Sequence, residues 1–480
     1  MSHIFDKPLF LLSLLLLAFV LIILLFVSVS LSWFMEKMQK TQDETPEADD
    51  LKETVESFKI FKTILLYLVP LLLIFPFAQQ AIAQAGWEAH LIDWLGLLVR
   101  WVHVVFGIAW IGASFYFIFL ENSLNRTEGL RDELAGNLWA VHGGGFYYLE
   151  KYKIAPKELP KTLHWFKYEA YFTWLSGFFL LMIVYYFNAK AFMIDPEVMD
   201  LAPETAIQIG LGTLLIGWFI YDALCKSALA QNKTAFAVVG FLFVVAVSFG
   251  LSQVLSGRAA FMHVGAMLGT IMAGNVFFVI IPAQKAMVKA AKYKRPLDAT
   301  LGKNAGLRSL HNNYITLPVI FVMISNHFPV TFGGGLNWII LAVLTLASVA
   351  VKHYINLHER GEKATLMLPF AALCIFALVI VTAPRSSSSG SQEKVTFAQV
   401  QPIIQQRCVT CHAAAPTDDT QKIAPNGLMF DTPEQIQKHA DRIMVRAVQT
   451  KTMPQGNKTN ITEEEREMIG RWIQQGAIIE

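Results

Sequence analysis

Trp101–Leu120 reads WVHVVFGIAWIGASFYFIFL, a run that contains no aspartate, glutamate, lysine or arginine. About 20 consecutive apolar residues cross a bilayer as an α-helix, so this run predicts a transmembrane span. Comparable runs recur along the chain. We therefore predict an all-α fold with a polytopic helical membrane domain of about ten transmembrane helices, near residues 9–34, 60–79, 93–120, 168–188, 205–225, 234–251, 262–283, 312–330, 335–352 and 364–383.

The composition of the 480-residue chain agrees with a protein embedded in a lipid bilayer. Apolar residues make up 54% of the chain and charged residues only 16%, which is typical of membrane proteins. The net charge of +2 arises from basic residues that lie in loops rather than along one face. This distribution argues against a nucleic-acid partner.

Basic residues also predict the orientation in the membrane. The loop 284–311 is rich in lysine and arginine and has a single acidic residue, which is typical of a cytoplasmic loop. Counting spans outward makes 121–167, 226–233 and 353–363 cytoplasmic as well, and it places both termini outside. We therefore expect the C-terminal domain to lie outside, on the face of the membrane opposite these basic loops.

Four segments follow from this pattern. Residues 1–85 contain two N-terminal helices, 86–384 an eight-helix membrane domain, 385–395 a Ser-rich tether and 396–480 a soluble domain. Lys59 and Lys62, the apolar run after them and Ala83-Gln84-Ala85 also imitate a signal peptide with its cleavage site. Because a span already precedes this run, we interpret it as a retained helix.

The C-terminal segment contains Cys408-Val-Thr-Cys411-His412. Two thiols at this spacing can form thioethers to one haem, and the adjacent histidine can then bind the iron. The alternative, half of a zinc site, needs a second Cys or His pair at similar spacing, and none follows. The motif therefore predicts a class I-like cytochrome c domain with one covalent haem c, which agrees with an oxidising compartment.

The sixth iron ligand is expected to be a thioether from a downstream loop. Met453, which precedes Pro454, fits best, so His412 and Met453 are the predicted metal ligands. The rest of the domain predicts a helix over 396–407 and a last helix that begins with a Thr462–Glu465 capping box and ends at Gly476. Phe397 and Trp472 are expected to pack these helices together. The competing ligands are Met429, Met444, Met468 and His439.

Histidines within the spans form two predicted layers. His103, His263 and His327 lie near the outer face, and the inner layer contains His142, His164, His311 and His353. Two imidazoles on facing helices can hold a haem b, and His103 with His263 is the favoured pair, ahead of His327. The alternative is that each histidine only packs helices together through hydrogen bonds. Glu169, Asp222 and Asn275 lie within or at the edge of spans, where they could handle protons. His311-Asn312-Asn313 opens the eighth span, where it could contact a ligand or only cap the helix.

Three longer motifs resemble the bacterial membrane-bound urate oxidase family of the PuuD type, in which an eight-helix membrane domain precedes a cytochrome c. The similarity extends from about residue 87 to the end, and the N-terminal pair of helices departs from the family pattern. The motifs are Trp101-Val-His103 through Phe115-Tyr-Phe117, Leu138-Trp-Ala-Val-His-Gly-Gly-Gly-Phe-Tyr147 and Leu163-His-Trp-Phe-Lys-Tyr-Glu-Ala-Tyr171.

The resemblance implies that urate is oxidised to 5-hydroxyisourate. Electrons would pass through the fused haem c to a downstream cytochrome or terminal cytochrome oxidase, without hydrogen peroxide. We expect the matched motifs to contact urate, with aromatic rings that stack on the purine and a histidine or glutamate that takes its proton. The candidate catalytic residues are His142, His164, Glu169, Trp139 and Trp165.

These residues are predicted to be cytoplasmic, whereas haem c is outside, so electrons would have to cross about 30 Å of hydrocarbon through relay cofactors. Without a membrane haem, urate must bind near the outer face instead, around Arg100, His103 and Arg258. Two other functions stay open. One is a different membrane oxidoreductase that oxidises a quinol or a porphyrinogen, and the other is a non-catalytic membrane-tethered cytochrome c.

Overall fold

The computed structural model describes Thr54, Val55, Lys59, Lys62 and residues 88–127, 129–296, 298–383, 394–418 and 421–479. The first two predicted spans and the tether over 385–393 lie outside the described residues. Residues 96–291 and 296–480 belong to one compact unit. The arrangement discussed below is the arrangement within that unit.

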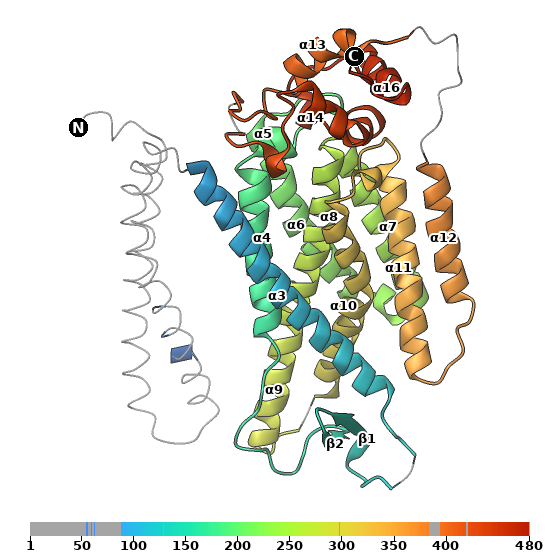
Figure 1. The fold of residues 1–480 in the computed structure, drawn as a ribbon. Helices are drawn as coiled ribbons and strands as arrows, with labels where there is room; N and C mark the ends of the chain where they lie inside the picture. Colours follow the sequence, from blue (N-terminus) through green and yellow to red (C-terminus); the bar gives the residue numbers. More distant parts are fainter. Residues whose placement is uncertain are drawn as a thin grey trace, which may run out of the picture. The chain divides into compact units, whose positions relative to one another are not determined.

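The described chain is mostly helical (Figure 1). Its helices are α3 (Glu88–Asn122), α4 (Tyr168–Leu181), α5 (Ala189–Phe192), α6 (Pro203–Lys226), α7 (Lys233–Ser252), α8 (Gly257–Gly274), α9 (Ile281–Lys292), α10 (Ala299–Ser325), α11 (Asn337–Glu359), α12 (Met367–Val381), α13 (Phe397–Arg407), α14 (Pro433–Lys438), α15 (Ala440–Ile443) and α16 (Glu463–Gln474). Single π-helical turns extend three of them: η2 (Met182–Tyr186), η4 (Asn275–Ile280) and η7 (Met444–Gln449). The 3₁₀ turns are η3 (Ala228–Gln231), η5 (Pro329–Thr331), η6 (Pro425–Gly427) and η8 (Gln455–Asn457).

Several of these helices suit a bilayer. Among the described residues, six helical segments are long and apolar enough to cross a membrane: Trp94–Asn122, Tyr168–Tyr186, Pro203–Lys226, Lys233–Ser252, Gly257–Lys292 and Asn337–Glu359. All eight spans predicted from residue 93 onward overlap a helix. The two that are not among the six overlap α10, which carries buried polar residues, and α12, which has 15 residues. Multiple apolar helices suggest a multi-pass membrane protein.

The expectation of an all-α fold needs one correction. The predicted loop 121–167 contains an antiparallel hairpin of β1 (Leu134–His142) and β2 (Gly145–Tyr152). Gly143 and Gly144 connect the strands with positive φ angles of 58° and 79°, as a two-residue hairpin turn of type I′ requires. The Gly-Gly-Gly sequence is therefore a tight turn rather than an irregular loop.

Helix α8 is the central helix of the membrane bundle and contacts α4, α6, α7 and α10 (Figure 1). Small residues let the helix backbones approach closely. An added Cβ at Gly265 would lie 2.6 Å from the Val322 side chain on α10, and one at Gly274 would lie 2.6 Å from Trp218 on α6. This close packing leaves most of α8 buried, including its histidine.

The C-terminal residues fold around their own apolar core, which includes Val400, Ile404, Ile469 and Trp472. The predicted first helix is confirmed as α13, and the Thr462–Glu465 capping box begins α16 as predicted. The rings of Phe397 and Trp472 lie 5.5 Å apart. The predicted helical architecture of this domain is confirmed at these positions.

Candidate functional site

The Cys408–His412 segment forms a tight turn at the end of α13. The backbone N–H groups of Cys411 and His412 both donate to the carbonyl oxygen of Cys408, at 3.2 and 3.0 Å. The Nδ1 of His412 lies 2.9 Å from the carbonyl oxygen of Leu428, so Nδ1 carries the proton that it donates. This leaves the Nε2 lone pair free, which is the usual arrangement of a metal-binding histidine.

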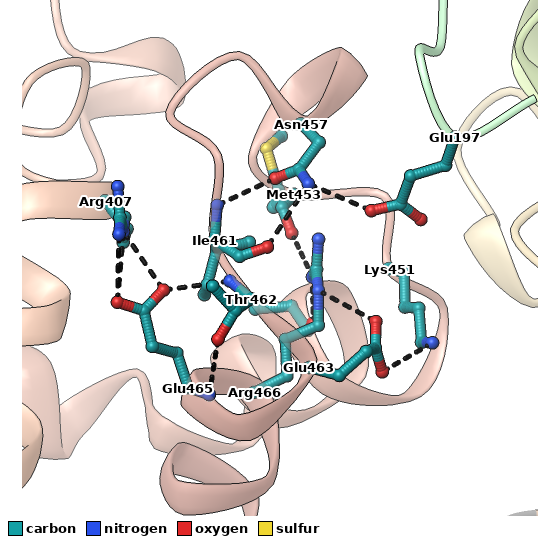
Figure 2. Close-up of polar contacts among 11 residues, drawn as sticks. Glu197, Arg407, Lys451, Met453, Asn457, Ile461, Thr462, Glu463, Glu465 and Arg466 are labelled. Atoms are coloured by element: carbon teal, nitrogen blue, oxygen red, sulfur yellow. Dashed lines mark hydrogen bonds and ion pairs between the residues drawn. The ribbon is translucent and has the colours of Figure 1, made fainter. Parts of the chain in front are cut away.

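Met453 lies in the loop between η7 and α16, which Arg466 holds in place (Figure 2). The guanidinium of Arg466 donates to the carbonyl oxygen of Met453 at 2.8 Å and to that of Ala447. Arg466 is only 1% exposed. A buried charge that holds two backbone carbonyls fixes the loop that carries the predicted sixth ligand.

The alternatives for this ligand set are placed as follows. Met468 packs against the apolar core of the C-terminal domain, as expected of a core residue. His439 lies beside Phe430, with ring centroids 6.3 Å apart. Within the described parts of the chain, no group of three or more His, Cys, Asp or Glu side chains could hold a metal ion.

The predicted haem b pair lies within the bundle, but each ring packs against a different helix. His103 contacts Thr173 O and Ser176 Oγ of α4 through Nδ1, at 3.0 and 3.1 Å. His263 is fully buried, with Nδ1 2.8 Å from Ala259 O and an unpartnered Nε2. A Cβ on Gly210 of α6 would lie 2.4 Å from that Nε2. The free nitrogen of His263 suits a ligand, whereas its packing against α6 leaves little space at that nitrogen.

His327 is exposed and lies just after α10. The outer layer of histidines therefore contains one fully buried ring, one partly buried ring and one exposed ring.

A hydrogen-bonded network centred on Arg308 joins α6, η4 and α10. Arg308 donates to Asp222 Oδ1 at 2.6 Å and to Asn275 Oδ1 at 3.0 Å. Asn275 in turn donates to Tyr221 Oη and to Asn312 Oδ1, at 3.0 and 2.8 Å. His311 and Asn312 lie in the middle of α10, which begins at Ala299, so they do not cap a helix. The polar groups of this network are mutually satisfied, as expected of a structural core.

Lys352 is a buried cation that sequence reasoning missed, because it falls at the predicted end of a span, where lysine usually anchors the interface. It is fully buried, and its Nζ lies 3.5 Å above the ring of Phe115 and has no hydrogen-bond partner. One turn further along α11, Asn356 accepts from Asn313 Nδ2 at 3.0 Å. Unpaired buried cations are costly, so Lys352 is a candidate for contact with an anion.

The predicted catalytic residues fall into two separate groups. Trp139 and His142 lie on the exposed hairpin, where Trp139 packs against Tyr148 with centroids 4.7 Å apart. His164 is exposed, Trp165 packs against a small core with Ala170, and Glu169 is in the first turn of α4. No hydrogen bond or ring contact joins the two groups within the part of the chain that the structure describes. Their role in binding urate stays a prediction.

A cavity of about 500 Å³ lies between the membrane helices and the C-terminal domain. Arg258 belongs to its lining, as does Met453. Arg446, which sequence reasoning missed, enters from η7, nearly 190 positions away from Arg258 in the chain. The other polar side chains of the lining include Asp195, Glu197, Gln253, Asn326, Asn337, Thr450, Lys451 and Thr452.

The comparisons with known proteins agree with the resemblance. The family model described as urate oxidase N-terminal matches residues 89–383, which is more than half of the chain. No curated protein and no solved structure matches.

Proposed function

The chain belongs to the urate oxidase N-terminal family, and from this premise we propose that it oxidises urate and passes the electrons through a haem c on its C-terminal domain. Family membership suggests urate oxidation. The electron route is the further part of the proposal. It ends on a downstream cytochrome or terminal oxidase of the respiratory chain, so that no hydrogen peroxide forms.

The reaction sets three requirements. The urate monoanion and one water give 5-hydroxyisourate, one proton and two electrons. The protein must therefore hold an anion, accept a proton and provide an exit for electrons. Multi-pass helices with a separate C-terminal domain suit such a division of labour, with urate bound among or beside the helices and the electron exit on the domain.

The observation that carries the haem c proposal is the geometry of His412. Its Nδ1 is engaged by Leu428 O at 2.9 Å, so its Nε2 is free to bind iron next to Cys408 and Cys411. Arg466 fixes the backbone of Met453, which would supply a second protein ligand to the iron. When bound, the haem supplies a one-electron acceptor, and methionine ligation raises its potential.

We keep a haem b between His103 and His263 as a secondary proposal. The unpartnered Nε2 of His263 supports it, and the close packing of that ring against Gly210 argues against it. No step of the proposed reaction depends on this haem.

The proposed location is the bacterial inner membrane with the C-terminal domain in the periplasm, supported by the basic loop 284–311.

Anaerobic reduction tests the function. Adding urate to the purified, oxidised protein should reduce its haem c, which is seen as the appearance of the c-type absorbance band of the reduced haem. A quinol should not cause this change. Reduction by the quinol alone would favour the different oxidoreductase. If urate leaves the band unchanged while ascorbate reduces it, the protein is a tethered electron carrier and the proposal fails.

A further inference from the structure

The cavity of about 500 Å³ has walls from two parts of the chain. Phe192, Arg258 and Asn337 belong to the membrane domain, and Arg446 and Met453 belong to the C-terminal domain. Small-molecule sites usually measure roughly 300–1,000 Å³. The cavity is thus large enough for a purine, and it lies beside the loop of the predicted sixth iron ligand.

Two guanidinium groups face this cavity without an acidic partner. Arg258 donates through Nε to Asn326 Oδ1 at 2.6 Å, and its guanidinium carbon lies 4.6 Å from the centre of the Phe192 ring. No described carboxylate lies within ion-pair distance of Arg258 or of Arg446. Burial, followed by the nearby charges of Arg258 and Arg442, lowers the pKa of Arg446. The two arginines therefore repel each other, and an anion between them would relieve the repulsion.

The two acidic residues of the lining, Asp195 and Glu197, form no ion pair with either arginine in the described structure. Glu197 accepts a hydrogen bond from Asn457 Nδ2 at 2.9 Å (Figure 2). Burial, opposed by a backbone hydrogen bond and reinforced by the charge of Glu197, raises the pKa of Asp195. Lys451 also lines the cavity, and it is paired with Glu463 at 2.7 Å. The charges of Asp195 and Glu197 interact instead with Arg466, which is not part of the lining, so Arg258 and Arg446 are left without an ion pair.

Asn337 provides a second, independent sign of a ligand. It is 7% exposed, it lines the cavity, and its Nδ2 donates to Phe332 O at 3.3 Å. Its Oδ1 is buried and has no hydrogen-bond partner. Unsatisfied buried acceptors are uncommon and costly, so this oxygen is suited to an N–H donor of a bound molecule.

We propose that this cavity binds urate as a planar anion, with Arg258 and Arg446 on its oxygens and Asn337 Oδ1 on a ring N–H. This inference rests on the proposed function and names the site of its substrate. Urate has carbonyl oxygens and ring N–H groups around its whole edge, which matches both kinds of partner. Urate bound here gives up two electrons and a proton and gains water beside Met453, so its electrons need not cross the hydrocarbon.

Binding can be measured without turnover. The full-length protein is reduced with dithionite, so that it cannot accept electrons, and urate binding is followed by equilibrium dialysis without oxygen. Arg258→Gln and Arg446→Gln should each weaken binding about tenfold or more, because each removes a charged hydrogen bond. Lys438→Gln removes a positive charge from an exposed side chain of the same domain, outside the cavity, and should leave the dissociation constant unchanged.

A second variant guards against misfolding of the arginine variants. Gln253 is an exposed residue of the lining, so Gln253→Glu should fold normally and weaken urate binding at least threefold through charge repulsion. Wild-type affinity in Arg258→Gln and Arg446→Gln, or in Gln253→Glu, would overturn the inference. Loss of urate binding in Lys352→Met alone would also overturn the inference, because it would place the urate site at Lys352 instead of this cavity. A wild-type protein that neither binds nor oxidises urate would instead refute the proposed function.

Discussion

The Nη1 of Arg466 donates to the carbonyl oxygen of Met453 at 2.8 Å, so a buried cation of α16 holds the loop of the predicted sixth iron ligand. Arg466→Met should free this loop and destabilise the C-terminal domain by about 1.5–3 kcal/mol, the usual contribution of a hydrogen bond from a charged group. The long-wavelength band of methionine bound to ferric haem should weaken, and the midpoint potential should fall.

Lys438→Gln is the control for this variant, because Lys438 is exposed in the same domain. It should leave the band and the potential unchanged. If Arg466→Met lowers the thermal midpoint but keeps both spectral properties, Met453 is not held in place by Arg466, or it does not bind the iron.

Haem attachment is tested at the two thiols. Replacing Cys408 and Cys411 together by serine should abolish covalent haem, seen as loss of haem staining of the denatured protein on a gel. Urate-dependent oxygen consumption by membranes should be lost as well. Cys374→Ser, which changes a thiol in α12, should alter neither measurement. Unchanged respiratory coupling in the double variant would refute the electron route.

Two glycines of α6 provide a test of how closely α6 and α8 pack. A Cβ at Gly210 would lie 2.4 Å from the ring of His263, and one at Gly217 would lie 2.4 Å from the side chain of Met267. Both side chains are fully buried, but imidazole is rigid, whereas a methionine side chain can turn aside. Gly210→Ala should therefore lower stability by about 1–3 kcal/mol, and Gly217→Ala by less.

Thermal unfolding in detergent distinguishes these variants. Gly212→Ala serves as the control, since a Cβ there would meet nothing within 4 Å. Equal midpoints for Gly210→Ala and Gly212→Ala would show that His263 can leave its position against α6. That result would favour a haem in the space it vacates.

Local spacing explains what the sequence could predict. The capping box at Thr462 and the contact between Phe397 and Trp472 follow from helical periodicity, and both are confirmed. The positions of the apolar helices follow from hydropathy in the same way. The hairpin was missed, although two glycines between strand-like runs signal one. An apolar stretch this short does not distinguish strand from loop.

The candidate cavity could not be predicted in full. Arg258 is recognisable from the sequence as a residue at the outer edge of a span, a position where arginine commonly anchors a helix at the interface. Arg446 and Asn337 come from distant segments that meet only in the folded chain. The burial of Lys352 likewise depends on the packing of α11 against neighbouring helices, which no local pattern encodes.

Acid should destabilise the C-terminal domain through Glu465. Burial raises the pKa of this carboxyl, but hydrogen bonds from Arg407 and Thr462 outweigh it, and the pKa is lowered overall. The stabilisation is therefore present above the unfolded pKa of about 4.3 and is lost as the pH falls through the lower folded value. Glu465→Gln should flatten the dependence of the thermal midpoint on pH in this acidic window.

Glu467→Gln removes an exposed carboxylate from the same helix and should keep the wild-type dependence on pH. An acid transition that is identical in wild type and Glu465→Gln would show that another group controls it.

Asp222 pairs with one buried and one exposed cation. The effect of burial on the stability contributed by an ion pair can therefore be tested at a single carboxylate. Arg308 and Lys226 both approach it to 2.6 Å, but the side chain of Arg308 is 5% exposed and that of Lys226 is 72% exposed. Breaking a buried pair costs about 3–5 kcal/mol, because the remaining charge is left uncompensated. A surface pair contributes about 0–1 kcal/mol.

Arg308→Gln should thus lower the thermal midpoint in detergent far more than Lys226→Gln. Adding Asp222→Asn to Arg308→Gln should restore part of the loss, since no buried carboxylate then lacks a partner. If the double variant is less stable than Arg308→Gln by the full effect of Asp222→Asn alone, the two side chains do not interact. In that case the hydrogen bond from Arg308 to Asn275, rather than the ion pair, holds η4 against α10.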